Sequence, residues 1–417
     1  MIAFHYPPYQ GSSGVLRTWN FSRYLPDNGW APLLLTASPR AYGPMEERPG
    51  GLQVPANLRV WRATAFDTAR HLSIRGRYLK WMALPDRWSS WYPAAVMRSL
   101  AIVRKHRPRL IWSTYPIASA HLVALTVQRF TGLPWIADFR DSMTEEGYPA
   151  NPLERRMYRW IERHAVARAS AIVFTTEGTR RMYTERYGAK AAERFHVIPN
   201  GFGEDSFVRA EQLARAVPAR ASGTPLQLIH SGVLYPSERD PRPFLEAVAR
   251  LKKSGRISSG TVQIMFRASG HDGLIQSLID AADLRDIVKL AGSLAYEPAL
   301  AEMLNADALL LFQAANCNHQ IPAKLYEYLR SGRPIFALTD ERGDTAAVLR
   351  GAGITTIADL ASADDIERQL PRFLDALRNG TAPAAERQVA AKFSRESQSG
   401  ELAALLRATN ETAKQAG

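Results

Sequence analysis

The sequence predicts an α/β protein built from two domains with parallel sheets. Short apolar runs alternate with longer amphipathic stretches along all 417 residues, as strands and crossover helices do. The chain is too long for one typical core and fits two domains of about 200 residues. A Pro-Asn-Gly turn at 199–201 ends one apolar run, and a polar, Ala- and Arg-rich linker follows at 203–224. We therefore place the domains at 1–202 and 203–385, with a helical tail at 386–417.

The expected strands follow from the short apolar runs. In the first half they are 2–6, 32–36, 58–62, 110–114, 135–138, 171–175 and 195–198. In the second half they are 226–231, 262–267, 288–291, 308–312, 334–338 and 354–357. No sequence repeat links the halves, so the repetition is one of architecture.

Composition narrows the class of protein. The hydrophobic fraction of 46% indicates a globular chain, and no run approaches the roughly 18 apolar residues of a membrane span. Residues 1–8 read as a short buried strand and a loop, not as a secretory signal. The single cysteine, Cys317, excludes an internal disulfide and fits a reducing cytoplasm. We expect Cys317 to be a small buried residue rather than a reactive thiol.

The net charge of +13 favours anionic partners. Zinc-ligand spacings, RNA-binding signatures and long basic runs are missing from the sequence, so nucleic acid is not an expected partner. An anionic membrane surface fits better, which predicts a cytoplasmic protein that is peripheral on the inner face of the membrane.

The segment 321–335 is the most informative stretch. Pro322 suits a helix start and Gly332 a helix exit. Lys324 falls in the first turn, where the helix dipole disfavours a cation, so it requires a partner such as a phosphate. Glu327 lies on the same face and can accept from sugar hydroxyls, such as those of a ribose. A Lys–Glu pair on an ordinary surface helix is the alternative.

Two loops join a strand to a helix and contain glycine. The first spans 7–17 and the second 230–243. Glycine lets backbone approach a ligand closely, and the helix N-terminus attracts anions. The dinucleotide spacing G-x-G-x-x-G and the Walker pattern are both missing, so an ordinary turn is the alternative. The candidate residues are Gly11, Ser13, Gly14 and Arg17 in the first loop, and Gly232 and Arg239 in the second, with Arg242 as the rival of Arg239.

Charged residues end the predicted strand at 135–138. Asp138, Arg140 and Asp141 lie at its carboxyl end, the end that faces ligands in open α/β sheets. The two aspartates are candidates for orienting an acceptor hydroxyl or for holding Arg140. A structural Asp–Arg–Asp network is an equal alternative. A hydrolase with paired carboxylates has no other support.

Basic and aromatic residues interleave between 70 and 92. We expect most of Trp81, Trp88 and Trp91 to be core, with the cations Arg75, Arg77 and Lys80 exposed. The same composition also suits a lipid headgroup interface, so membrane contact is a hypothesis here.

The pattern P-x-K-x-x-E-Y-L-x-x-G-x-P-I at 322–335 resembles the donor-site helix of retaining glycosyltransferases of family 4. Further similar elements are D-F-R-D at 138–141, I-P-N-G at 198–201 and the strand and glycine at 230–234. The resemblance implies the GT-B fold: two Rossmann-like domains facing across a cleft, with a C-terminal helix crossing back to the first domain.

The resemblance also implies roles for individual residues. Glu327 would bind the ribose, while Arg239 and Lys324 would hold the diphosphate. His319 stands where the family often has a second Glu that contacts the donor sugar. The donor-binding set implied is Gly232, Arg239, His319, Lys324, Leu325 and Glu327, the catalytic set is Arg239, Lys324, Glu327 and Asp138, and the acceptor-side set is Gly11, Ser13, Gly14, Arg17, Arg140 and Asp141.

The expected activity is transfer of a sugar (EC 2.4, hexosyltransferase type) with retention of anomeric configuration. The donor would be a nucleotide-diphosphate sugar and the acceptor a growing surface polysaccharide or a lipid-linked glycan. We expect no cofactor and no metal, because the D-x-D triplet of metal-bridged sites is missing. The alternatives are a nucleotide-sugar epimerase on a similar frame and a non-catalytic nucleotide-sugar-binding scaffold.

Overall fold

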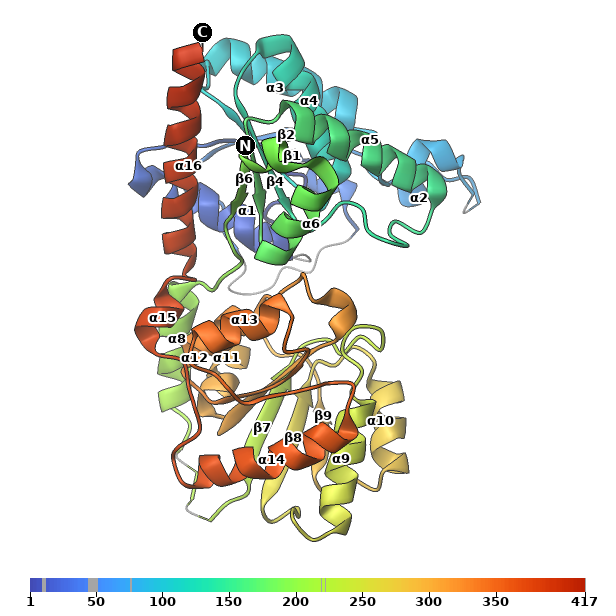
Figure 1. Cartoon of the computed structure of the whole chain (residues 1–417). Coiled ribbons are helices and arrows are strands. Elements are labelled where there is room, and N and C mark those ends of the chain that lie inside the picture. Colours follow the sequence, from blue (N-terminus) through green and yellow to red (C-terminus); the bar gives the residue numbers. More distant parts are fainter. Residues whose placement is uncertain (10–12, 44–51, 76, 219, 222, 417) are drawn as a thin grey trace. The chain divides into compact units, whose positions relative to one another are not determined.

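The computed structural model describes residues 1–9, 13–43, 52–75, 77–218, 220–221 and 223–416 (Figure 1). It divides into two compact units. Unit 1 comprises Met1–Pro199 with Arg395–Gly417, and unit 2 comprises Asn200–Ser394. The chain thus returns to unit 1 at Arg395, whereas the sequence placed the start of the tail at 386. The reason is that Ala390 and Phe393 still pack into the core of unit 2.

Unit 1 contains parallel strands that form two groups. They are β1 (Leu33–Ala37), β2 (Arg59–Ala63), β3 (Ile111–Thr114), β4 (Trp135–Arg140), β5 (Ala171–Phe174) and β6 (Phe195–Val197). β1 pairs with β2, and the second group has the order β3-β4-β5-β6. Residues 1–4 join the groups, because Ile2 bridges Leu35 of β1 and Ser113 of β3. The strand predicted at 2–6 is therefore only this short bridge, since the backbone beyond Phe4 turns away into the Pro7-Pro8 loop.

Helices cover this sheet and bury apolar side chains on two faces. They are α1 (Ser13–Tyr24), α2 (Thr68–His71), α3 (Trp91–His106), α4 (Ala118–Thr131), α5 (Pro152–Arg168), α6 (Glu177–Tyr187), α7 (Ala189–Ala192) and α16 (Arg395–Ala416), with short 3-10 turns η1 (Pro26–Asn28), η2 (Pro39–Ala41) and η3 (Lys80–Ala83). The last helix, α16, lies alongside α1 (Figure 1). Leu402 and Leu406 of α16 join Phe21 of α1 and Leu25, the residue after α1, in one core cluster.

Unit 2 is built on a single parallel sheet of order β12-β11-β10-β7-β8-β9. Its strands are β7 (Leu226–Ser231), β8 (Val262–Arg267), β9 (Val288–Ala291), β10 (Ala308–Gln313), β11 (Ile335–Thr339) and β12 (Ile357–Ala358). Its helices are α8 (Glu204–Arg215), α9 (Arg242–Lys253), α10 (Asp272–Ala281), α11 (Tyr296–Asn305), α12 (Lys324–Ser331), α13 (Asp344–Gly351), α14 (Ala363–Arg378) and α15 (Arg387–Ala391), with η4 at Ala315–Cys317. The predicted α/β class with parallel sheets is confirmed in both units.

The segment at 70–92, in which basic and aromatic residues interleave, matches its prediction that most of the tryptophans are core. Trp91 is fully buried and Trp88 packs against the core. Trp81 is 67% exposed and lies outside the core. Its turn, η3, buries none of its own residues. Cys317 is buried, as predicted.

A helix that crosses a membrane must be both long and apolar. Among the residues that the structure describes, none of the helices combines the length and the apolar character needed to cross a membrane.

Candidate functional site

The first candidate site lies in unit 2, where β10 leads through η4 into α12. The helix begins at Lys324 and ends before Gly332, whose φ of 66° is left-handed, as the predicted glycine exit requires. Pro322 precedes the helix instead of occupying its first position. Lys324 therefore stands at the very start of the helix, where the helix dipole disfavours a cation.

Lys324 contacts a buried histidine at the carboxyl end of β7. The Lys324 Nζ lies 3.1 Å from His230 Nε2, and His230 Nδ1 lies 2.9 Å from the carbonyl oxygen of Leu310. Because that carbonyl only accepts, Nδ1 carries the proton and Nε2 accepts from the ammonium. Burial holds the pKa of His230 well below its usual value, helped by the charge of Lys324, so the ring stays neutral.

The environment makes Lys324 an unusual cation. The pKa of its ammonium is lowered to about 7. Burial is the main cause and the charge of Arg239 adds to it, while the charge of Glu327 acts in the opposite direction. An anion bound here would reverse this shift, because an opposite charge favours the protonated amine. The geometry thus holds a lysine that gains charge when a phosphate arrives.

Gly232 provides the space for this arrangement. Its φ of +118° is in the region that side chains avoid, and a Cβ there would lie 2.6 Å from Lys324 Nζ. The neighbouring Ser231 N–H donates to the Tyr328 hydroxyl at 3.1 Å. The loop after β7 is therefore fixed against α12, as the predicted phosphate loop requires.

Arg239 is the better of the two arginine candidates. Its guanidinium donates to the carbonyl of Val233 at 3.0 Å, and its Nε is buried with no hydrogen-bond partner among the described residues. The rival Arg242 instead pairs with Asp240 at 2.9 Å on the surface. A half-buried guanidinium whose Nε–H is unused among the described residues is available to an anionic ligand, whereas Arg242 is already paired.

The remaining donor candidates differ in whether their side chains can contact a donor. Glu327 accepts from the Tyr296 hydroxyl at 2.6 Å, which orients its carboxylate. His319 is half-buried in the loop before α12, with Nε2 3.5 Å from the side-chain nitrogen of Gln320. Leu325 is fully buried in the core, so its side chain cannot contact a donor, and that assignment is corrected.

The second candidate site lies in unit 1, at the carboxyl end of β4. Arg17 and Asp138 form a two-pronged ion pair there, with N–O distances of 2.9 and 3.0 Å. Arg17 is 1% exposed and Asp138 is completely buried. Arg17 also donates to the carbonyl of Pro199, and Thr114 donates to Asp138. This geometry corrects the expected ligand and catalytic roles of both residues, because their polar atoms are occupied in linking α1 to the sheet.

Arg140 has the features of a ligand-binding residue. Its φ of 60° is left-handed, and the pairing of β4 with β5 shifts register between Asp138 and Arg140. Such strain in a non-glycine residue is typical of functional positions. The guanidinium is buried, donates to the carbonyl of Tyr115 at 3.4 Å, and leaves Nε without a partner among the described residues.

Gly14 allows this position, because any Cβ there would overlap the Arg140 guanidinium. Asp141 is half-buried and accepts from the Thr175 hydroxyl at 3.4 Å. Ser13 begins α1, and Gly11 lies outside the described residues. The structure therefore brings Gly14 and Arg140 together, and separately Gly232, Arg239, Lys324 and Glu327.

Sequence reasoning missed His230 and Tyr296. His230 had one usable signal, its place at a strand end two residues before the phosphate-loop glycine. Tyr296 had none, because it reaches Glu327 from α11 through tertiary packing alone.

Comparison with known proteins indicates the class of protein to which this chain is similar. Residues 14–201 match the family described as glycosyl transferase 4-like domain. The alpha-D-kanosaminyltransferase of Streptomyces kanamyceticus is 23% identical over 379 residues, covering 85% of this chain and 92% of that protein.

Two solved structures are similar over nearly the whole chain. Anabaena HepE in complex with UDP and glucose has a TM-score of 0.64 and 13% identity, covering 98% of this chain and all of that one. WaaG, a glycosyltransferase involved in lipopolysaccharide biosynthesis, has a TM-score of 0.63 and 15% identity, covering 97% and 98%.

The fold and the family match define a glycosyltransferase with the GT-B fold. The chain is a transferase, and its residues 14–201 match the glycosyl transferase 4-like domain.

The Arg17–Asp138 pair predicts a large loss of stability when one partner is removed. Arg17→Met leaves a buried carboxylate without its cation, which costs about 3–5 kcal/mol of unfolding free energy, measured by urea denaturation. Glu177→Gln breaks the exposed Arg180–Glu177 pair and should cost less than about 1 kcal/mol. If both variants lose equally little unfolding free energy, the structural role is refuted and Arg17 and Asp138 are again candidates for ligand contacts.

Proposed function

We propose that this glycosyltransferase uses a nucleotide-diphosphate sugar, with UDP as the nucleotide to test first. The cluster of Lys324, His230, Gly232 and Arg239 carries the proposal. It combines a helix start, a glycine loop and two cations within one unit, and these are the elements that recognise a diphosphate. HepE, which shares the fold, has been solved in complex with UDP.

The chemistry proposed is transfer with retention. The bond from the anomeric carbon to the diphosphate oxygen breaks, and a bond from the acceptor hydroxyl oxygen forms on the same face. The acceptor proton passes to the released phosphate oxygen. Lys324 and Arg239 would stabilise the charge that grows on this leaving group, while Glu327, oriented by Tyr296, would hold the ribose.

The acceptor class proposed is a glycan or a lipid-linked glycan of a surface polysaccharide. The similar fold of WaaG, named for lipopolysaccharide biosynthesis, supports this class. Arg140 supports it as well, because a buried cation at the carboxyl end of β4 is placed to contact an anionic group of such an acceptor.

The donor site predicts selective stabilisation by one nucleotide. In a thermal-shift panel of nucleoside diphosphates, UDP at a hundred times its Kd should add about 2.7 kcal/mol to the stability of the folded protein. Lys324→Ala and Glu327→Ala should each abolish the shift, because they remove the diphosphate and ribose contacts. Arg242→Ala should keep it, since Arg242 already pairs with Asp240. A wild-type protein that is well folded yet shifted by no nucleotide would overturn the proposal.

The low pKa of Lys324 predicts a pH dependence of donor binding. In the free protein the ammonium loses its proton as pH rises through about 7, and bound diphosphate raises that pKa again. Above pH 7, UDP binding should therefore take up about one proton, and affinity should fall by up to about tenfold per pH unit. Below pH 7 this residue is already charged and contributes no uptake.

Calorimetry in buffers of different ionisation enthalpy measures that proton uptake directly. The second ionisation of the phosphate, near pH 6, is nearly complete above pH 7 and so does not mask the effect. The Lys324→Ala variant should bind UDP weakly, and its affinity for UDP should not fall as pH rises above 7. A slope that survives in Lys324→Ala assigns the proton to another group.

We also propose that segment 66–81 of unit 1 contacts an anionic membrane. Ile74 is 80% exposed and Trp81 67% exposed, and Phe66, Tyr78 and Leu79 are exposed as well. The cations Arg75, Arg77 and Lys80 are exposed among them, as the sequence predicted. The carboxylates of this region, Asp67 and Asp86, are buried, so the exposed charge is positive. Apolar and cationic side chains on one surface fit the headgroup layer of anionic lipid.

Co-sedimentation with vesicles tests this contact. Wild type should sediment with vesicles containing phosphatidylglycerol at low salt and less at high salt, and not with phosphatidylcholine alone. Leu79→Ser with Trp81→Ser should remove most of the binding, because the buried apolar area is lost. Leu274→Ser, an exposed leucine of unit 2, is the matched control and should bind as wild type does. Equal binding of all three proteins would refute the assignment.

A further inference from the structure

The loop between β4 and α5, residues 141–151, begins at the ligand-facing edge of the sheet and is held at its base by a cluster of polar side chains. Glu162 of α5, which is 1% exposed, lies at the centre of this cluster. Its Oε1 accepts from Arg186 at 2.7 Å and from Tyr187 at 2.6 Å. Its Oε2 accepts from Tyr183 at 2.7 Å and from Thr144 at 3.1 Å. Both carboxylate oxygens are therefore fully used.

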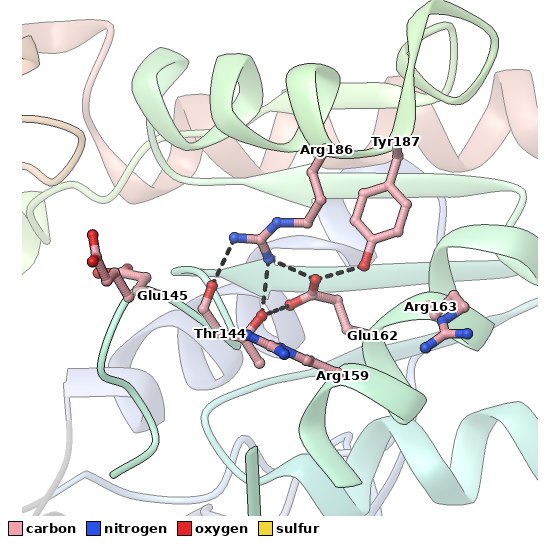
Figure 2. Close-up of a pocket in the computed structure, with 8 residues that line it drawn as sticks. Thr144, Glu145, Arg159, Glu162, Arg163, Arg186 and Tyr187 are labelled. Carbon is pink, nitrogen blue, oxygen red and sulfur yellow. Dashed lines mark hydrogen bonds and ion pairs between the residues drawn. The ribbon is translucent and has the colours of Figure 1, made fainter. Parts of the chain in front are cut away.

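The same cluster holds the loop backbone (Figure 2). Arg186 donates to the Thr144 carbonyl and to its hydroxyl, each at 2.9 Å, beside the Arg186–Glu162 pair. The Met143 N–H donates to the Tyr183 hydroxyl at 3.1 Å. A cavity of about 570 Å³ borders the cluster, so hydrogen bonds rather than apolar packing hold this side of the loop.

The far end of the loop presents an aromatic ring. Two backbone hydrogen bonds between Glu145 and Tyr148 close a turn, and Tyr148 is 50% exposed. Its hydroxyl lies 3.4 Å from the hydroxyl of Tyr115, the residue after β3 whose carbonyl accepts from Arg140. Tyr148 is thus an exposed ring that is connected through Tyr115 to the candidate acceptor-side cation Arg140, in a loop that leaves the sheet edge where parallel sheets bind ligands.

We infer that Tyr148 is a platform for a sugar ring of the acceptor, and that Glu162, Arg186 and Tyr183 are positioning residues that fix its loop. The inference rests on the proposed function only in taking the acceptor to be a glycan. An exposed aromatic face offers large contact area at low conformational cost, which suits the apolar face of a sugar ring. The ring is useful only if its loop is already ordered, and the buried ion pair supplies that order.

Binding of octyl glucosides, galactosides and mannosides, observed by saturation-transfer NMR without nucleotide, tests the platform. At least one glycoside should bind wild type, and Tyr148→Ala should weaken it by about tenfold. Tyr148→Phe keeps the ring and should bind nearly as wild type does. Trp160→Ala, an exposed aromatic on α5, is the matched control and should leave binding unchanged. Equal binding by Tyr148→Ala, or no glycoside bound by wild type, overturns the inference.

Glu162→Gln tests the positioning role. It should weaken glycoside binding by about tenfold, yet leave the UDP thermal shift unchanged, because the nucleotide cluster lies in unit 2. Cleavage by a glutamate-specific protease after Glu145 or Glu146 should also become faster at temperatures where the protein stays folded. A parallel loss of UDP binding would instead mean general unfolding, and unchanged glycoside binding would refute the role. Since the NMR experiment needs no donor, failure of the donor proposal stays distinguishable.

Discussion

A lysine at the first position of α12 is the constraint on which the donor site depends. The helix dipole and burial both oppose a charge on Lys324, and Arg239 adds repulsion. Two groups partly offset this cost: the neutral acceptor Nε2 of His230 and the carboxylate of Glu327. Gly232, which has no side chain, leaves space for the ammonium of Lys324. A phosphate would add a full negative charge to this balance, which is the physical ground for proposing a diphosphate ligand here.

Unit 1 shows a different solution for buried charge. Arg17 and Asp138 satisfy one another within the protein, together with Thr114 and the carbonyl of Pro199. Arg140, two residues beyond Asp138, donates to a backbone carbonyl, keeps an Nε without a partner among the described residues, and adopts a left-handed backbone. The same short sequence thus contains a structural charge and an available one. The register shift in β4 separates them, because it turns successive side chains into different surroundings.

Sequence patterns predicted the parts of this structure that local chemistry controls. The alternation of strands and helices, the glycine exit of α12 and the burial of Cys317 all follow from spacing and composition. The proximity of Lys324 and Glu327 could also be predicted, since both lie on one turn of one helix. Partners that come from other elements could not be found this way. Arg17 meets Asp138 only in the folded sheet, so a surface arginine and a buried one look alike in the sequence.

Trp81 is a large aromatic residue that lies outside the core. Large aromatic residues are usually buried, so the core assignment was reasonable, and Trp91 follows it. Trp81 lies in a short 3-10 turn that buries none of its own residues. Hydrophobicity alone does not tell core from exposed surface when a segment lacks the length to form a regular element that packs.

In both candidate sites a glycine lies against the side chain of a cationic residue. In unit 2 the glycine of a strand-to-helix loop lies against Lys324, and in unit 1 Gly14 lies against Arg140. In each case a Cβ at the glycine would meet the end of a flexible cationic side chain, which would have to move. Gly232 also has a φ of +118° that favours glycine, whereas Gly14 lies within α1. An anion that reached Lys324 would therefore also meet the backbone of the loop after β7, where N–H groups can donate to it. The pairing of glycine with a cation is thus a physical reason to propose anion binding at a loop that lacks the dinucleotide spacing.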